Sequence, residues 1–450
     1  MSQGASDHHP EPAGSNRPRL QLHVPEPPAR PGAIPDFAAH AIPPAGATPR
    51  PDPSTPAGEM RDLAYGLIRV LDGGAAVGPW APALSAETLR RMLRAMALTR
   101  AFDDRMFRAQ RQGKTSFYMK SRGEEAVAVA AAFALDDADM LFPSYRQQGL
   151  LIARGHPMVE MMNQIYSNRA DRLMGRQLPV MYSVKEKGFF SISGNLTTQY
   201  PQAVGWAMAS AARRDTRIAA AWCGEGSTAE GDFHSACTFA AVYRAPVVLN
   251  VVNNQWAISS FSGFAGGEAT TFAARGLGYG LAALRVDGND ALAVYAATQW
   301  AAERARANHG ATLIELFTYR AEGHSTSDDP SAYRSADEAV QWPLGDPIRR
   351  LADHLIALGE WDAERQTAMD LDLAEQVRLA QKEAEKNGVL GHGLDQPLES
   401  MFEGVFADMP WHLAEQQAQM LAEWRAAGLP DQVRRPRNDG LEGHGAGDGQ

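Results

Sequence analysis

Polar side chains suited to a metal site follow two neighbouring predicted strands. Glu225 comes after the apolar stretch Ile218–Trp222, and Asn254 comes after Val247–Val252. The two residues are 29 positions apart, about the length of one strand–helix–strand crossover. Because parallel strands end at one edge of their sheet, a carboxylate and an amide oxygen meet there, and both suit a hard cation such as Mg²⁺.

The same edge is predicted to bind phosphate groups. A helix expected over 228–242 directs its free N–H groups and the positive end of its dipole toward that edge. Gly224 and Gly226 allow a ligand to approach the backbone closely. Charge-assisted donors follow two other predicted strands, namely Arg146, Arg320 and His324. The sequence therefore predicts a site for a diphosphate together with Mg²⁺.

Plainer interpretations of several residues remain open. A Gly-x-Gly after a strand is usually only a turn, and Ser325–Asp329 also suits the N-terminal cap of a helix. Glu230 and His234, four residues apart on the predicted helix, suit either a metal site or a buried polar contact. Cys223 is interpreted as a packed strand residue, because no charge partner for a reactive thiol is evident.

Alternating strands and helices must position these groups. An amphipathic helix is predicted from the N-cap Ser85 to Gly113, and further helices over 201–212 and 290–308. The strands expected are Met140–Phe142, Ile218–Trp222, Val247–Val252, Leu284–Val286 and Leu313–Phe317. This alternation predicts an α/β fold with a parallel sheet and helices on both faces.

Composition divides the chain into four regions. Residues 1–60 hold 14 of the 28 prolines and suit either a disordered tail or an extended arm that lies on a partner. We expect an α/β domain over 61–345, a helical region over 346–430 and a flexible, Gly-rich tail over 431–450.

Charge and hydropathy exclude several classes of protein. The chain has 450 residues with 43 Lys+Arg and 53 Asp+Glu, a net charge of −10, which argues against a nucleic-acid surface. The longest apolar run, Ala126–Leu135, is too short for a membrane span, and Met1–Pro10 does not resemble a signal peptide. Only two cysteines occur, which excludes a disulfide scaffold and a zinc-cysteine site and fits a reducing cytoplasm.

Longer stretches around these residues resemble a known family. The segment GEGSTAEGDFHSACTFAAVYRAPVVLNVVNNQWAIS is similar to the thiamine diphosphate motif. With RVDGNDALAVY and TYRAEGHSTSDDPSAYRS, it resembles the α subunit of the E1 component of 2-oxoacid dehydrogenase complexes. The segments SFYMKSRGEEA, GRQLPVMYSVKEKGFFSISGNLTTQ and HSTSDDPSAYR resemble the branched-chain member, and LQLHVPEPPARPG resembles its bacterial form. The resemblance covers roughly residues 15–430.

The resemblance implies a thiamine-diphosphate-binding fold and a set of site residues. At the matching positions, Glu225, Asn254 and the backbone carbonyl of Trp256 are the implied Mg²⁺ ligands. The implied contacts to the diphosphate are Tyr145, Arg146, Gly226, Ser227, Arg320 and His324.

Further positions carry other implied roles. Leu196 is implied to meet the aminopyrimidine of the cofactor through its backbone. A substrate pocket bordered by Phe117, Tyr145 and Leu196 suits a branched aliphatic chain. Positions that bind structural K⁺ in some relatives are matched by Ser193, Thr198 and Gln199.

Three departures from the family pattern stand at the predicted site. Glu225 replaces the Asp that is most common in thiamine enzymes, and its longer side chain shifts the metal slightly. Gly194-Asn195 stand where some relatives have Ser-Pro, and Val252 stands where some have a diphosphate-binding Arg. Ser325 matches a position that is phosphorylated in animal relatives.

The activity implied is oxidative decarboxylation of branched-chain 2-oxoacids, such as 3-methyl-2-oxobutanoate, in the degradation of Val, Leu and Ile. The acyl group then passes to a lipoyl group on an E2 acyltransferase. His324, with a reference pKa of about 6.5, is expected to orient the diphosphate and to stabilise or protonate intermediates.

The resemblance also implies a partner, because the aminopyrimidine half of the cofactor binds a β subunit in this family. We therefore expect an α₂β₂ heterotetramer. Three alternatives stay open: pyruvate or acetoin as the substrate, a non-catalytic protein that binds Mg-diphosphate, and a metallohydrolase that uses Glu230 and His234.

Overall fold

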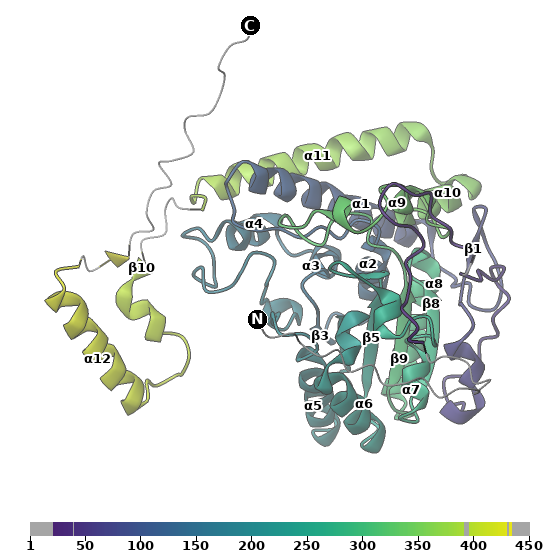
Figure 1. Ribbon diagram of the computed structural model, residues 1–450, viewed down its shortest axis with the longest axis horizontal. Coiled ribbons are helices and arrows are strands. Elements are labelled where there is room, and N and C mark those ends of the chain that lie inside the picture. The colour runs from purple at the N-terminus through teal and green to yellow at the C-terminus, as the bar shows by residue number, and fades with distance from the viewer. Residues whose placement is uncertain (1–20, 39, 391–395, 430–431, 434–450) are drawn as a thin grey trace, which may run out of the picture.

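The core of the protein is a five-stranded parallel sheet (Figure 1). The computed structural model describes residues 21–38, 40–390, 396–429 and 432–433. The strand order is β3-β4-β5-β9-β8. The strands are β3 (Met140–Phe142), β4 (Ala219–Gly224), β5 (Val247–Asn253), β8 (Ala282–Asp287) and β9 (Thr312–Phe317). The five strands predicted from the sequence are all present, and the predicted fold class is confirmed.

Each strand is buried on both faces, and alternate residues enter two separate cores. Trp222 and Val248 face one core, which also holds α2 (Glu125–Ala134) and α8 (Ala291–Arg306). The neighbouring residues Cys223 and Leu249 face the other core, formed with α5 (Gln199–Ala212) and α6 (Gly231–Val242). Continuous apolar strands are the expected consequence of helices on both faces. The helices thus leave the strand ends as the places where polar groups gather.

The long predicted helix is α1 (Ala86–Arg111). The Ser85 side chain caps it by accepting a hydrogen bond from the Thr88 amide at 3.1 Å. The helix ends at Arg111, Gln112 is its C-cap, and Gly113 takes a positive φ of 72° in the left-handed region. Both predicted ends of this helix are confirmed.

The helix predicted over 228–242 begins later than expected. Residues Gly226–Ala229 form a 3-10 turn, and α6 starts only at Gly231. The Thr228 amide donates to the Glu225 carbonyl at 3.1 Å, and the Thr228 hydroxyl donates to the same oxygen. These bonds tighten the first turn, so the backbone after Glu225 follows a short 3-10 turn before the α-helix.

Several of the remaining helices extend the first core. Helix α11 (Ala363–Glu385) lies against α1 and α4 (Met158–Tyr166), as the top of Figure 1 shows. The other α-helices are α3 (Gln148–Ala153), α7 (Ala274–Leu277), α9 (Glu338–Gln341), α10 (Pro347–Ala357) and α12 (Trp411–Ala426). Short antiparallel pairs join β1 (Leu71–Asp72) to β2 (Ala75–Ala76), β6 (Trp256–Ala257) to β7 (Ser260–Phe261), and β10 (Gln396–Pro397) to β11 (Gln432–Val433).

The Pro-rich segment is held along the body of its own chain. The indoles of Trp80 and Trp300 donate to the carbonyls of Pro49 and Pro51, at 3.0 and 2.8 Å. Proline-rich backbone forms no internal ladder, so side chains of the body satisfy its carbonyl groups. Residues 1–20, the start of the predicted arm, lie outside the described part of the chain.

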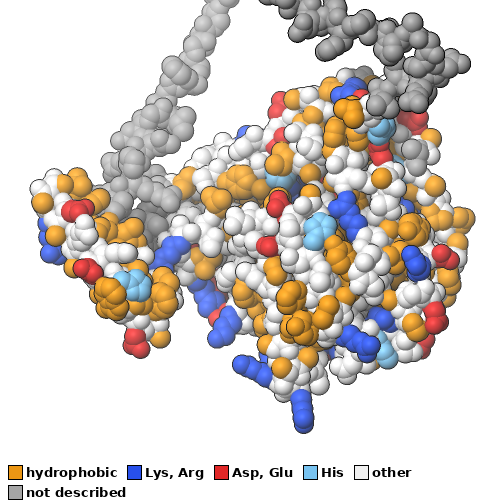
Figure 2. All heavy atoms as spheres, turned by 60° about the horizontal axis from the view of Figure 1, so that its bottom comes forward, with side chains coloured by type: hydrophobic (Ala, Val, Ile, Leu, Met, Phe, Trp, Pro, Cys, Tyr) orange, Lys and Arg blue, Asp and Glu red, His pale blue; other side chains and the backbone are white. Residues whose placement is uncertain are grey.

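A small lobe near the C-terminus stands apart from the sheet and its helices (Figure 1). It contains the 3-10 helix Leu398–Phe402 and α12, and no residue of α12 is buried. Figure 2 shows hydrophobic side chains on its surface, and the large exposed ones include Met401, Val405, Phe406, Met409 and Trp411. Across the described ranges, no helix combines the length and apolar character needed to cross a bilayer.

We predict that protonation of His40 weakens the docking of the N-terminal segment. Its ring packs against Trp342 and Phe317, with ring centroids 5.7 and 5.5 Å away. Burial, and then the positive charge of Arg285, lower the pKa of His40 from 6.5 to about 4. The unfolded chain therefore takes up the proton first as the pH falls below 6.5, and stability declines down to pH 4.

The measurement is urea unfolding at pH 7 and pH 5. The loss of stability between the two pH values should be about 2 kcal/mol smaller in His40→Leu than in the native chain. The exposed His412→Leu serves as the control and should keep the native pH dependence. An unchanged pH dependence in His40→Leu contradicts the prediction.

Candidate active site

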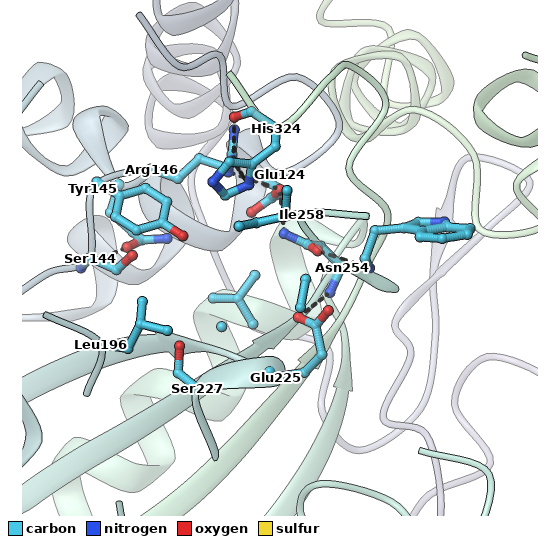
Figure 3. Close-up of a pocket in the computed structure, with 16 residues that line it drawn as sticks. Glu124, Ser144, Tyr145, Arg146, Leu196, Glu225, Ser227, Asn254, Ile258 and His324 are labelled. Carbon is cyan, nitrogen blue, oxygen red and sulfur yellow. Dashed lines mark hydrogen bonds and ion pairs between the residues drawn. The ribbon is translucent and has the colours of Figure 1, made fainter. Parts of the chain in front are cut away.

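A cavity of about 190 Å³ opens at the carboxyl ends of β4 and β5. Most of the side chains predicted to bind ligand line it (Figure 3): Tyr145, Arg146, Leu196, Glu225, Gly226, Ser227, Asn254, Trp256 and His324. Pockets that enclose a whole drug-sized ligand usually measure about 300–1,000 Å³. Two of its lining residues, Leu196 and Ile258, are 45% and 55% exposed, so the cavity reaches the surface.

The predicted metal pair is brought together. The backbone N–H of Asn254 donates to Oε2 of Glu225 at 3.4 Å, across the adjacent ends of β4 and β5. The other carboxylate oxygen, Oε1, is buried and has no hydrogen-bond partner. Burial raises the pKa of Glu225 from 4.5 to about 7. Glu225 and Asn254 line the same cavity, and a carboxylate oxygen without a partner and a side-chain amide oxygen are donors that suit a hard cation.

The amide of Asn254 is oriented by a residue that the sequence analysis did not identify. Oε1 of Glu124 accepts a hydrogen bond from Nδ2 of Asn254 at 2.9 Å. Oδ1 of Asn254 accepts from the backbone amide of Trp256 at 3.3 Å. Glu124 also lies 3.6 Å from Nε of Arg146, and both of these side chains are buried. A signal was present in the sequence, because Glu124 stands just before the apolar run that forms the buried helix α2.

Arg146 and His324 lie in direct contact on one side of the cavity (Figure 3). Nη2 of Arg146 lies 3.2 Å from Nδ1 of His324 and donates to the His324 carbonyl at 2.9 Å. A guanidinium has no acceptor, so Nδ1 accepts and the proton of the neutral imidazole sits on Nε2. The side chain is thus arranged to donate a hydrogen bond through Nε2.

The charge state of His324 differs from the expectation. Burial lowers its pKa from 6.5 to about 3, and the charges of Arg146 and Arg320 lower it too, while Asp328 opposes them. The expectation that this imidazole titrates near its reference value is therefore wrong for the arrangement seen here. At neutral pH it is a neutral hydrogen-bonding group.

The predicted turn after β4 is tightly enclosed. A Cβ atom on Gly226 would lie 2.5 Å from Cβ of Ala257, so a side chain does not fit there. Gly224 differs, since a Cβ atom would meet only Oγ of Ser227, at 3.9 Å. The Ser227 carbonyl accepts a hydrogen bond from the Thr197 hydroxyl at 2.8 Å. Only the second glycine is therefore required by packing.

Apolar groups complete the lining of the cavity. The Tyr145 ring meets the His324 ring edge to face, with centroids 5.8 Å apart. Ile258 also lines the cavity and has a positive φ of 56°, which is strained for a β-branched residue. Strain of this kind is concentrated at functional sites, and no pattern in the sequence predicts it.

Arg320 lies behind the cavity wall and does not line it. Nη1 donates to the Trp256 carbonyl at 2.6 Å and Nη2 donates to the Ile258 carbonyl at 2.8 Å. Nη2 also lies 2.8 Å from the hydroxyl of Tyr333. In this structure the guanidinium holds the loop that carries Trp256, rather than facing the space predicted for the diphosphate.

Four other predicted residues also lie outside the cavity lining. Phe117 is half-buried, and its carbonyl lies 3.4 Å from the Thr115 hydroxyl. Ser193 and Thr198 both bond to the backbone of Asn195, at 3.1 and 3.2 Å. The side chain of Gln199 donates to the Trp222 carbonyl at 2.6 Å.

Three other segments had more than one interpretation from the sequence, and the structure shows the contacts of each. His234 is exposed and contacts the hydroxyl of Tyr279, so the buried contact with Glu230 is not found. Among the described residues, no group of three or more His, Cys, Asp or Glu side chains is placed to hold a metal ion. Cys223 is a packed strand residue, and burial raises its pKa. Asp329 caps the 3-10 helix Pro330–Ala332.

Comparison with known proteins assigns the family. The model of the family described as dehydrogenase E1 component matches residues 93–392. This chain belongs to that family. A second model, described as the N-terminal part of the 2-oxoisovalerate dehydrogenase E1 α subunit, matches residues 18–58 of the Pro-rich segment. The predicted fold is confirmed, since the E1 domain is a thiamine-diphosphate-binding fold, and membership implies thiamine diphosphate as the cofactor.

Named relatives cover most of this E1 chain. It is 60% identical to 2-oxoisovalerate dehydrogenase subunit alpha of Pseudomonas aeruginosa, over 89% of this chain and 98% of that protein. The mitochondrial protein of the same name in Homo sapiens is 41% identical over 78% of each chain. The mitochondrial subunit alpha 1 of Arabidopsis thaliana is 39% identical, over 73% of this chain and 68% of that protein.

We predict that Glu124→Ala destabilises this E1 chain. Removal of the carboxylate leaves the buried Arg146 guanidinium without its nearest counter-charge, which costs about 3 kcal/mol. Glu124→Gln should cost less stability than Glu124→Ala, because the new amide oxygen can still accept the hydrogen bond from Asn254. Burial raises the pKa of the Glu124 carboxyl, although the charges of Arg146 and Arg320 oppose that rise.

Urea unfolding measures both changes, with Glu322→Ala as the matched control. Glu322 pairs with Lys120 at 3.0 Å but is 34% exposed, so its loss should cost less than about 1 kcal/mol. Equal losses from Glu124→Ala and Glu322→Ala argue against the bridging role of Glu124.

Proposed function

We propose that this chain acts with a β subunit in oxidative decarboxylation of branched-chain 2-oxoacids, such as 3-methyl-2-oxobutanoate. It would transfer the acyl group to a lipoyl group on an E2 protein, as part of Val, Leu and Ile degradation. The observation that carries the proposal is the unpartnered Glu225 oxygen beside Asn254, in a chain 60% identical to a 2-oxoisovalerate dehydrogenase subunit.

The metal half of the proposal rests on the chemistry of the buried donors. We propose Glu225, Asn254 and the carbonyl of Trp256 as Mg²⁺ ligands. A cation beside Oε1 of Glu225 would offset the cost of burying that carboxylate. The Trp256 carbonyl already accepts from Arg320, but a carbonyl oxygen has two lone pairs and can serve both groups.

The diphosphate end of thiamine diphosphate fits the residues beside that metal position. We propose Tyr145, Arg146, Gly226, Ser227 and His324 as its contacts, and Leu196 as the backbone contact of the aminopyrimidine. Arg320 adds positive charge through the wall, since its donors are used by the loop. When bound, the cofactor supplies the carbon nucleophile and the electron sink for decarboxylation.

His324 is proposed as the catalytic side chain of this subunit. Its neutral imidazole accepts from Arg146 through Nδ1 and presents Nε2–H as a donor. Such a donor can orient an anionic oxygen and stabilise negative charge that develops near it. The charges of Arg146 and Arg320 lower the pKa of His324. A bound anion would offset these charges, so it would raise that pKa again.

Apolar residues at the mouth of the cavity support the branched-chain substrate. Leu196 is exposed beside the Tyr145 wall, and we propose both residues, with Phe117, as the border of the substrate pocket. Hydrophobic walls discriminate between similar side chains by only about 1–3 kcal/mol per methylene. We therefore expect the enzyme to prefer a branched acid but still to accept pyruvate at a lower rate.

The shape of the cavity supports a partner subunit. Its volume is small and its rim is exposed, so part of a cofactor bound there would extend beyond this chain. We propose an α₂β₂ assembly in the bacterial cytoplasm, with an E2 protein as a further partner. The exposed apolar side chains of the C-terminal lobe suit a protein contact.

Two finer assignments are also proposals. We retain the division into an arm (1–60), an α/β domain (61–345), a helical region (346–430) and a tail (431–450). A structural K⁺ is proposed at Ser193, Thr198 and Gln199, where the turn around Asn195 gathers oxygen atoms.

The first test is CO₂ release from 3-methyl-2-oxobutanoate and from pyruvate. We expect activity only when the chain is co-expressed with its β subunit and supplied with thiamine diphosphate and Mg²⁺, with preference for the branched acid. Glu225→Gln should bind Mg²⁺ more weakly and lose most of the activity, because the anionic ligand is gone. Preference for pyruvate contradicts the substrate assignment, and inactivity of a folded, cofactor-loaded complex favours the non-catalytic alternative.

We further predict that His324→Ala lowers acylation of the lipoyl group by roughly 10²–10⁴-fold, the usual contribution of a positioned acid–base group. The measurement is single-turnover acylation at saturating cofactor. His156→Ala is the matched control, because this buried histidine lies outside the cavity lining. A native rate in His324→Ala rules out the catalytic assignment.

A further inference from the structure

A second cavity, of about 360 Å³, lies at the opposite edge of the sheet. It is formed where β8 and β9 begin and where α6 and α8 end. Residues of the N-terminal segment, including Ser54, close one side of it. None of these elements presents a residue assigned to the candidate active site.

The lining of this cavity is basic. It contains Arg244, Arg304 and His309, and no Asp or Glu. Arg304 is only 5% exposed, and no carboxylate among the described residues pairs with it. Nη1 of Arg304 donates to the carbonyls of Pro53 and Thr55, at 2.6 and 2.8 Å. Its Nε atom is buried and has no hydrogen-bond partner.

A buried guanidinium without a counter-charge is costly, because it stays protonated in any protein environment. The ring of Trp300 lies 5.8 Å from Cζ of Arg304 and compensates only part of that charge. Asp52, a carboxylate close enough to feel the charge of His309, is exposed and accepts a hydrogen bond from the Ser54 backbone amide at 2.8 Å.

The ends of two helices offer a competing explanation for the basic residues. Carbonyl groups at the ends of α6 and α8 carry partial negative charge, which a nearby cation offsets. Arg244 follows α6 in the left-handed conformation, with φ 47°. Arg214 follows α5 in the same way, with φ 57°, yet it lines no described cavity. An arginine that offsets the partial charge at the end of α6 explains Arg244. It does not explain why Arg304 and His309 line the same cavity.

We propose that this cavity binds a doubly charged oxyanion, either inorganic phosphate or the phosphate group of a small monoester. Arg244 and Arg304 would donate charge-assisted hydrogen bonds to it, and His309 would add a third donor. The anion would then join the N-terminal segment to the edge of the sheet. This proposal is independent of the proposed catalytic function.

Isothermal titration of the full-length chain with inorganic phosphate tests the proposal, with thiamine diphosphate and Mg²⁺ present to occupy the candidate active site. Arg244→Gln should weaken phosphate binding at least about tenfold, as expected for loss of one charge-assisted hydrogen bond. Arg214→Gln, the matched helix-end arginine, should leave the affinity unchanged. Within the described ranges neither arginine has a side-chain partner, so neither variant is expected to unfold.

Parallel titrations with glycerol 2-phosphate and with acetate at equal ionic strength identify the ligand. Tighter binding of the monoester assigns the site to a phosphorylated metabolite, and tighter binding of phosphate assigns it to the free ion. The proposal is overturned if no phosphate binds up to about 10 mM, if acetate binds equally well, or if Arg244→Gln and Arg214→Gln weaken binding equally. It is also overturned if only Arg146→Gln abolishes binding, which would place the phosphate in the candidate active site.

Discussion

The candidate site depends on one buried carboxylate, that of Glu124. It accepts from Asn254 at the end of β5 and lies beside Arg146, which in turn contacts His324. Three segments far apart in the sequence are thereby held around one cavity. Because burial makes each unpaired polar group expensive, the network constrains the orientation of every member. The Asn254 amide and the His324 imidazole are both arranged by these neighbours before any ligand binds.

The architecture of the sheet explains why such a network forms at this edge. Alternate residues of each strand are committed to two apolar cores, so few polar side chains, such as Asn250 and Glu315, lie at the strand centres. The strand ends are the remaining positions, and in a parallel sheet all of the carboxyl ends lie together. The second cavity lies at the opposite edge, where helices end and strands begin. The length of the strands therefore separates the second cavity from the candidate active site.

Glu225 and His324 show how environment changes side-chain chemistry. Burial raises the pKa of Glu225 to about 7 and lowers that of His324 to about 3, so both lose charge for the same physical reason. A cation and an anion bound in the cavity would reverse these two shifts together. The cavity is thus suited to a cation and an anion bound as a pair.

The sequence by itself determined the strand–helix alternation, the capped helix α1 and the pairing of Glu225 with Asn254, because these follow from local periodicity and spacing. Its long motifs also determined the family. Only the tertiary structure decided that Glu124 bridges the site, that Arg320 lies behind the wall and that Ile258 is strained. It also decided that His324 is neutral and that α6 begins late. These features depend on contacts between distant segments and on burial, which no local pattern encodes.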